Sequence, residues 1–147
     1  PDIRGKAGGM DREVVEQKLE SLRRCLERIE VKCPAEADTL MTDFDLQDIV
    51  SLNLSRAVQL CVDIGAHLIS GTDQAPPDTM GQTFDRLEQT GMLTKTLAVN
   101  LKKAVGFRNI AVHNYDAINW QIVHSIVKNH LVDFSTFARI VAMKLDG

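Results

Sequence analysis

Apolar residues recur every three or four positions over almost the whole chain, which is the spacing of amphipathic helices. No stretch alternates between apolar and polar residues in the manner of a half-buried strand. In the first segment the apolar positions form one narrow stripe, made of Val15, Leu19, Leu22, Leu26 and Ile29. Pro34 should end this first helix, because proline cannot continue the backbone hydrogen-bond ladder. The pattern therefore predicts an all-α protein.

A longer second helix should begin near Thr42 or Asp43, either of which can cap it, and run to about Ser70. Its apolar face is broad and consists of Leu46, Val50, Leu54, Ala57, Val58, Cys61, Ile64 and Leu68. We expect a helix with so wide an apolar face to lie at the centre of the fold.

Three further helices follow in the remaining half of the chain. The predicted elements are a loop over 71–79, a short helix from about Met80 to Thr90 closed by Gly91, a helix that begins at Thr94, a turn over 114–119 and a last helix from about Trp120 to Leu145. The sequence thus predicts a bundle of four long helices and one short helix.

The chain has 147 residues, the size of one domain. Its first nine residues, Pro1 to Gly9, are rich in glycine and carry no apolar period. We interpret them as a leader foreign to the fold, and Met10 as the start of a single domain over residues 10–147. The mixture of 44% apolar and 25% charged residues is typical of a soluble globular protein.

No apolar run approaches the roughly 20 residues that a membrane span needs. No secretory signal is evident either, because Met10 is followed at once by charged residues. The cysteines form no CxxC pair and indicate neither a zinc site nor a disulfide framework; they are Cys25, Cys33 and Cys61. We therefore expect reduced thiols in a cytoplasmic protein that does not bind membranes.

The formal net charge of -3 argues against strong, indiscriminate binding to nucleic acid. The distribution of charge is uneven, however, since the stretch from Gln89 to Tyr115 has no acidic residue. Its cationic residues are Lys95, Lys102, Lys103 and Arg108. This basic stretch is either a solvated helix face or a local site for phosphates, with Lys102 and Lys103 as RNA-binding candidates.

Arg108 falls in the middle of the apolar stripe formed by Leu101, Ala104 and Val112. An unpaired charge is costly there, so Arg108 is either half of a structural ion pair or an anion site. His113 lies about 140° away from Arg108 on an ideal helix, whereas Tyr115 returns nearly to the direction of Arg108. Arg108 and His113 can meet if the helix loosens near Gly106 or ends at His113. Alternatively, a second subunit completes the site.

The order Arg108, four residues, His113, one residue, Tyr115 resembles the motif of the HEPN superfamily of helical ribonucleases, and more narrowly that of HepT-type toxins. Residues 53–69 are similar to the long second helix of that family, and residues 84–91 to its short third helix. Residues 107–115 resemble its active-site helix. The resemblance covers nearly everything from Met10 to the C-terminus.

The resemblance implies a HEPN-like helical bundle and a metal-independent endoribonuclease toxin with no cofactor, in which the RNA 2'-hydroxyl attacks its own phosphodiester. A histidine can move the proton at neutral pH, and an arginine can bind the phosphate through two parallel hydrogen bonds. We assign these roles to His113 and Arg108, with Asn109 orienting the phosphate or the histidine. The family also forms homodimers whose two motifs face a shared cleft.

The resemblance further implies a partner, an MntA-like nucleotidyltransferase antitoxin that attaches AMP to Tyr115. The added negative charge would compete with RNA for the site. The alternative is a tyrosine that only closes the helix end against the core. Transfer RNA is a candidate substrate by family habit alone.

Asp63 and His67 lie one helical turn apart and could form part of a metal site, but two ligands without a third are weak support. We expect Asp63 instead to be a polar residue of the second helix near the dimer cleft. His130 falls on the inner stripe of the last helix and should be a core residue. The alternative for the whole chain is a non-catalytic HEPN-like binding or regulatory subunit of a nucleotidyltransferase.

Overall fold

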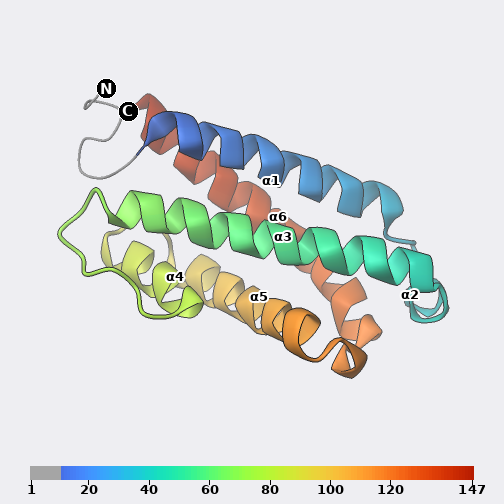
Figure 1. Ribbon diagram of the computed structural model, residues 1–147. Coiled ribbons are helices and arrows are strands. Elements are labelled where there is room, and N and C mark those ends of the chain that lie inside the picture. The colour runs from blue at the N-terminus through green and yellow to red at the C-terminus, as the bar shows by residue number, and fades with distance from the viewer. Residues whose placement is uncertain (1–10) are drawn as a thin grey trace.

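The computed structural model describes residues 11–147, and the leader expected over residues 1–9 lies outside this part of the chain. The elements are α1 (Arg12–Lys32), α2 (Ala37–Thr42), α3 (Phe44–Ile69), α4 (Met80–Gln89), α5 (Lys95–His113), the 3-10 helix η2 (Tyr115–Ala117) and α6 (Trp120–Asp146) (Figure 1). The helical bundle is therefore confirmed, with its four long helices and the short α4. The structure adds α2, which the sequence did not predict.

The long helices begin where side chains can cap them. Asp43 accepts a hydrogen bond from the backbone N–H of Leu46 at 3.0 Å, which fixes the start of α3. Thr94 does the same for Leu97 at 3.2 Å and starts α5. After α4 the chain reverses through Gly91, whose φ of +83° suits a residue without a Cβ.

The unpredicted helix α2 has only six residues, too few to show a helical period. It is held by Leu40, which is fully buried, and by the buried side chain of Gln47 at the start of α3. The Gln47 amide donates to the carbonyl oxygens of Leu40 at 2.9 Å and Met41 at 3.1 Å. These bonds satisfy carbonyls that the end of a helix leaves without partners.

Helix α3 lies at the centre of the bundle and contacts each of the other five α-helices. By length and composition alone it could cross a membrane, but more than half of its most apolar window is buried inside the protein. Its apolar character therefore belongs to the core, as its broad stripe predicted. Figure 1 shows α3 between α1 and α5.

The end of α5 lies at the same end of the bundle as the beginning of α3, opposite the C-terminal end of α6 (Figure 1). This relationship matters for function, because it brings the motif-bearing end of α5 beside the first turns of α3, which lie more than sixty residues earlier in the chain.

Candidate active site

Helix α5 is continuous from Lys95 to His113 and passes through Gly106 without a break. It ends because Asn114 leaves the helical conformation, with φ -152° and ψ 66°, while its N–H still bonds the carbonyl of Ile110 at 2.8 Å. Of the arrangements considered for Arg108 and His113, a loosened helix at Gly106 is therefore wrong, and a helix that ends at His113 is observed.

Arg108 is half-buried at the edge of the α5 core stripe. The stripe ends at Phe107, since Ile110 and Val112 are 44% and 53% exposed. The Arg108 guanidinium donates one hydrogen bond, to Asn109 Oδ1 at 3.3 Å. Within residues 11–147 no carboxylate pairs with it. The structural ion pair considered for Arg108 is thus absent from the described chain.

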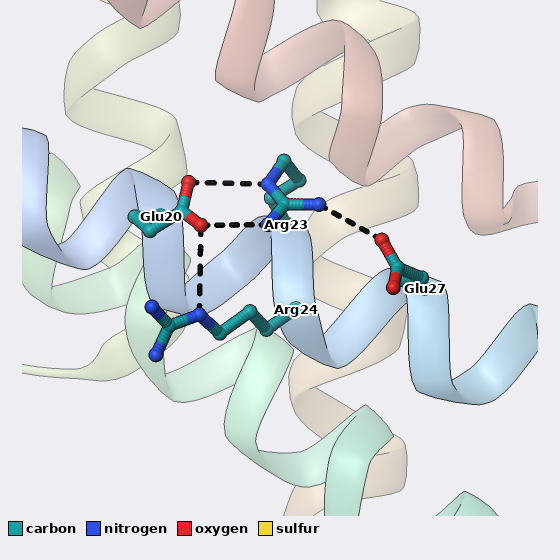
Figure 2. Close-up of polar contacts among 4 residues, drawn as sticks. All are labelled: Glu20, Arg23, Arg24 and Glu27. Carbon is teal, nitrogen blue, oxygen red and sulfur yellow. Dashed lines mark hydrogen bonds and ion pairs between the residues drawn. The ribbon is translucent and has the colours of Figure 1, made fainter.

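The arginines of α1 provide the contrast. Arg23 contacts Glu20 at 2.6 Å and Glu27 at 2.8 Å, and Arg24 contacts Glu20 at 3.5 Å (Figure 2). These guanidiniums are neutralised by acids of their own helix, and the hydrogen bond to Arg23 lowers the pKa of the Glu20 carboxyl. The guanidinium of Arg108 has no such acidic neighbour in the described chain, so the donors that do not contact Asn109 are available for an anion.

His113 is the last residue of α5 and is exposed to solvent. Because α5 is regular up to this point, His113 lies about 140° around the axis from Arg108 and about 7.5 Å along it. The two side chains make no hydrogen bond with each other in the described chain. One chain therefore presents both groups at the same helix end but does not join them.

Tyr115 does not continue the direction of Arg108, because the helix ends two residues earlier. Instead the turn of η2 carries Tyr115 back against α3, where its hydroxyl donates to Asp48 Oδ1 at 2.6 Å. The hydroxyl of Ser51, one turn further along α3, lies 3.4 Å from the phenolic oxygen. The ring packs against Trp120 with a centroid distance of 5.7 Å. Tyr115 remains 38% exposed.

The pKa of the Tyr115 phenol is raised above its ordinary value. The largest cause is partial burial, and the hydrogen bond to the Asp48 carboxylate and its negative charge act in the same direction. The contact with Ser51 offsets part of this rise. The phenol is therefore held in its neutral form, with its proton directed at a carboxylate.

The other residues of the predicted site differ in how free they are. Asn109 is exposed and its side-chain oxygen accepts from Arg108. Lys102 is paired with Asp85 of α4 at 3.0 Å, so part of its charge is neutralised. Lys103, on the next position of α5, is exposed and forms no ion pair within the described residues. The basic stretch thus presents Lys103 more freely than Lys102.

Asp63 is not brought to this end of the bundle. It accepts from Gln59 at 2.9 Å and pairs with Lys18 of α1 at 3.5 Å. It lies fifteen residues beyond Asp48 on α3, which corresponds to about 22 Å of helix. Asp48, not Asp63, is the acidic residue of α3 that lies beside the motif. In the described chain, no three His, Cys, Asp or Glu side chains gather to form a metal site.

The expectation that His130 is a core residue was wrong. Its side chain is 50% exposed and its Nδ1 lies 3.1 Å from Asp133 Oδ2. His130 follows the apolar spacing of α6, but other helices cover that side of α6 only in part. The surface there is hollowed by a cavity of about 580 Å³ between α5 and α6.

This cavity, which we term the α5–α6 groove, is lined mainly by apolar atoms. Its lining includes Lys103, Gly106 and Ile110 on the α5 side and Ile122 and Ile126 on the α6 side. Ile110 and Ile122 are 44% and 58% exposed. Gly106 adds to the hollow, because a Cβ there would meet no atom within 4 Å. The groove therefore exposes apolar side chains on the turns of α5 that flank Arg108.

Sequence reasoning missed Asp48 and Ser51. The two lie three residues apart and so share one face of α3, but nothing local relates them to a tyrosine 67 and 64 residues later. We did expect a polar residue of the long second helix to lie near the site, but the sequence could not identify which one.

Comparison with known proteins gives a consistent result. The family model described as ribonuclease HepT-like matches residues 15–141. A protein of Shewanella oneidensis named mRNA nuclease HepT is 36% identical over 129 residues, which cover 88% of this chain and 96% of that protein. A protein of Aphanizomenon flos-aquae named tRNA nuclease HepT is 26% identical over 126 residues, with 86% of each chain covered.

The fold is similar to that of a solved complex, the tri-AMPylated HEPN toxin of Shewanella oneidensis bound to an MNT antitoxin. The TM-score to that toxin chain is 0.82 at 36% sequence identity, and the match covers 88% of this chain and 97% of that one.

Proposed function

Because this chain belongs to the family of HepT-like ribonucleases, we propose that it is the RNA-cleaving toxin of a toxin–antitoxin pair. The observation that supports this most directly is the state of Arg108. It is a half-buried guanidinium without a carboxylate partner in the described chain, and it shares a helix end with an exposed histidine, His113.

The chemistry follows from these two side chains. Arg108 binds the scissile phosphate and stabilises the negative charge that develops on it in the transition state. His113 accepts the proton of the attacking 2'-hydroxyl or supplies one to the departing 5'-oxygen. Asn109, which already contacts Arg108, holds the guanidinium in its orientation. The products are a cyclic phosphate and a free 5'-hydroxyl.

We further propose that cleavage needs no metal ion. The internal 2'-hydroxyl replaces a metal-bound water as the nucleophile, and the guanidinium supplies the positive charge that a metal would otherwise provide. A guanidinium that supplies positive charge and an imidazole that gives or takes a proton are sufficient for this reaction.

The active unit is a homodimer in this proposal. Within one chain Arg108 and His113 point about 140° apart, so a site that uses both is best completed by a second copy. The α5–α6 groove offers that copy an apolar surface on the turns beside Arg108, and its exposed Ile110 and Ile122 would be covered by it. The RNA would then lie in the cleft between the two motifs.

The proposed partner is a nucleotidyltransferase antitoxin that attaches AMP to Tyr115. A relative of 36% identity has been solved in a tri-AMPylated form with such an antitoxin. Tyr115 is partly exposed and lies two residues after His113, so an added phosphate would place negative charge beside the RNA site and oppose substrate binding. We place the pair in the cytoplasm, where RNA and nucleoside triphosphates are available.

Expression in a bacterial host tests this function. The native chain should arrest growth and degrade RNA, and co-expression of its cognate nucleotidyltransferase should restore growth. The Tyr115→Phe variant should remain toxic in the presence of that enzyme, because it lacks the acceptor hydroxyl. A native chain that neither slows growth nor cuts RNA would instead indicate a non-catalytic subunit.

A further inference from the structure

We propose that Asp48 is the proton acceptor in the adenylylation of Tyr115, and that Ser51 helps to hold the phenolic oxygen in place for attack. This inference rests on the proposed function, since it concerns the chemistry of the same modification. It assigns a catalytic role to a residue of α3 that lies outside the Arg108–His113 motif.

The geometry fixes the phenolic oxygen from two sides. Its proton is directed at Asp48 Oδ1, 2.6 Å away, and the Ser51 hydroxyl lies at 3.4 Å. Ser51 is only 4% exposed, so its position is set by the packing of α3. The ring of Trp120, at 5.7 Å and inclined by 60°, limits the tilt of the tyrosine ring. An acceptor oxygen held in this way is already oriented for reaction.

The surroundings of Asp48 suit a base better than a structural anchor. Asp48 is exposed, and no lysine, arginine or histidine pairs with it within the described residues. It is also the only charged group in contact with the phenolic oxygen there. An ionised carboxylate with no cation beside it keeps its lone pairs available for the proton of Tyr115. The partial exposure of Tyr115 lets a nucleotide approach from solvent.

The step balances without any further reactant besides the nucleoside triphosphate that the partner enzyme binds. The Tyr115 oxygen forms a bond to the α-phosphorus, the bond from that phosphorus to the bridging oxygen breaks, and pyrophosphate leaves. The phenolic proton passes to Asp48 and then to water. The raised pKa of the phenol supports the need for a base, since at neutral pH the free phenolate is scarce.

Attachment of AMP changes the hydrogen bonding of the Tyr115 phenolic oxygen. The esterified oxygen has no proton to donate, and the new phosphodiester carries a negative charge close to the Asp48 carboxylate. The hydrogen bond between η2 and α3 is therefore lost on modification, and the remaining interaction between the two groups is repulsive. Adenylylation would thus release the turn that follows the active-site helix.

The test is adenylylation of the full-length chain by its purified nucleotidyltransferase with ATP, followed by intact-mass spectrometry over time. The substrates are the native chain, Asp48→Asn and Asp45→Asn. Asparagine at position 48 keeps the shape and a hydrogen-bond acceptor but cannot take a proton. Asp45 is an exposed acid on the turn of α3 before Asp48, so its variant removes the same charge without touching Tyr115.

We expect Asp48→Asn to slow AMP attachment by about 100-fold, the lower range for loss of a general base, and Asp45→Asn to react at the native rate. The deficit of Asp48→Asn should shrink as the pH rises, because phenolate then forms without a base. A merely structural role would leave the deficit independent of pH.

Equal rates for the native chain and Asp48→Asn would overturn the role of Asp48 while leaving the modification itself established. A deficit that does not change with pH would overturn it as well. A native chain that gains no AMP under these conditions would overturn both the modification and this inference.

Discussion

The hydroxyl of Tyr115 donates a 2.6 Å hydrogen bond to the carboxylate of Asp48, across 67 residues of chain. The bond joins the turn after α5 to the first turns of α3, the central helix. Both residues belong to the end of the bundle where α5 ends and α3 begins (Figure 1). Tyr115, the proposed modification site, is thus positioned by the core of the fold and not by the motif alone.

This contact predicts the titration of Tyr115. The chain has a single tyrosine, so ultraviolet difference absorbance at rising pH follows this phenol alone. The midpoint should lie above the ordinary value of about 10, because burial and the Asp48 carboxylate both favour the neutral form. In Asp48→Asn the midpoint should fall. A native midpoint at or below that of the variant would contradict the geometry.

The same shift has a consequence for stability. The folded protein binds the phenolic proton more tightly than the unfolded chain, so the stabilisation is fully present below the unfolded pKa of about 10. It is lost as the pH rises through the raised pKa of the folded state. Chemical denaturation measures the free energy of unfolding at pH values below and above the pKa of Tyr115. This free energy should fall less at alkaline pH in Asp48→Asn than in the native chain.

Most of the fold could be predicted because its signals are local. The apolar period gave the four long helices, and Asp43 and Thr94 marked the starts of α3 and α5 through caps that act within one turn. Helix α2 escaped prediction because six residues carry no measurable period, and its stability comes from the long-range bonds of Gln47.

In the candidate site too, residues of a local motif could be predicted and residues brought together by long-range contacts could not. Arg108 and His113 could be identified since both stand in one short motif on one helix. The partners of Tyr115 could not, because the contact depends on how the chain turns at Asn114 and on which turn of α3 lies opposite. His130 was placed by helical projection, and Asp63 by its membership of the long second helix. Neither says what packs against a given turn or face.

Substitution of Lys102 and Lys103 distinguishes an RNA-binding surface on α5 from a helix face that only contacts solvent. Lys103→Gln should weaken RNA binding. It should also reduce the slope of log K against log salt concentration by about one, the value for one phosphate contact. Lys102→Gln should have a smaller effect, because Asp85 already neutralises part of the Lys102 charge. Salt-titrated RNA binding measures both. No effect from Lys103→Gln would show that this face does not contact RNA, and equal effects would show that Asp85 does not weaken the contribution of Lys102.

The dimer can be tested by complementation. Arg108→Ala and His113→Ala should each be inactive alone, but a mixed dimer retains one arginine and one histidine from different chains. If each site takes one group from each chain, mixing should restore up to half of the native activity per dimer. RNA cleavage by co-purified, differently tagged chains provides the measurement. A mixture as inactive as its components would place both groups of a site in one chain.

Two glycines should respond in opposite ways to alanine. At Gly65 an added Cβ would lie 2.4 Å from Thr83 Cγ2 and 3.2 Å from Leu87 Cδ1, so Gly65→Ala should lower the free energy of unfolding by about 1–3 kcal/mol. At Gly106 the Cβ meets nothing, so Gly106→Ala should raise the stability of the monomer by up to about 1 kcal/mol.

Urea denaturation of both variants at a protein concentration too low for dimers measures these changes. A stable Gly65→Ala protein would contradict the close approach of α3 and α4. A larger substitution, Gly106→Leu, should fill the α5–α6 groove and lower the dimer fraction in sedimentation, whereas an unchanged dimer would show that the second copy binds elsewhere.

The central claim is that Arg108 and His113 cleave RNA without a metal ion. The most direct measurement is incubation of total RNA, in excess chelator, with the purified native chain, Arg108→Ala and His113→Ala, with thermal unfolding as the control for folding. Cleavage by the native chain alone, which leaves cyclic phosphate ends, is the predicted result. Cleavage that stops in chelator, or that persists in both folded variants, would contradict the account.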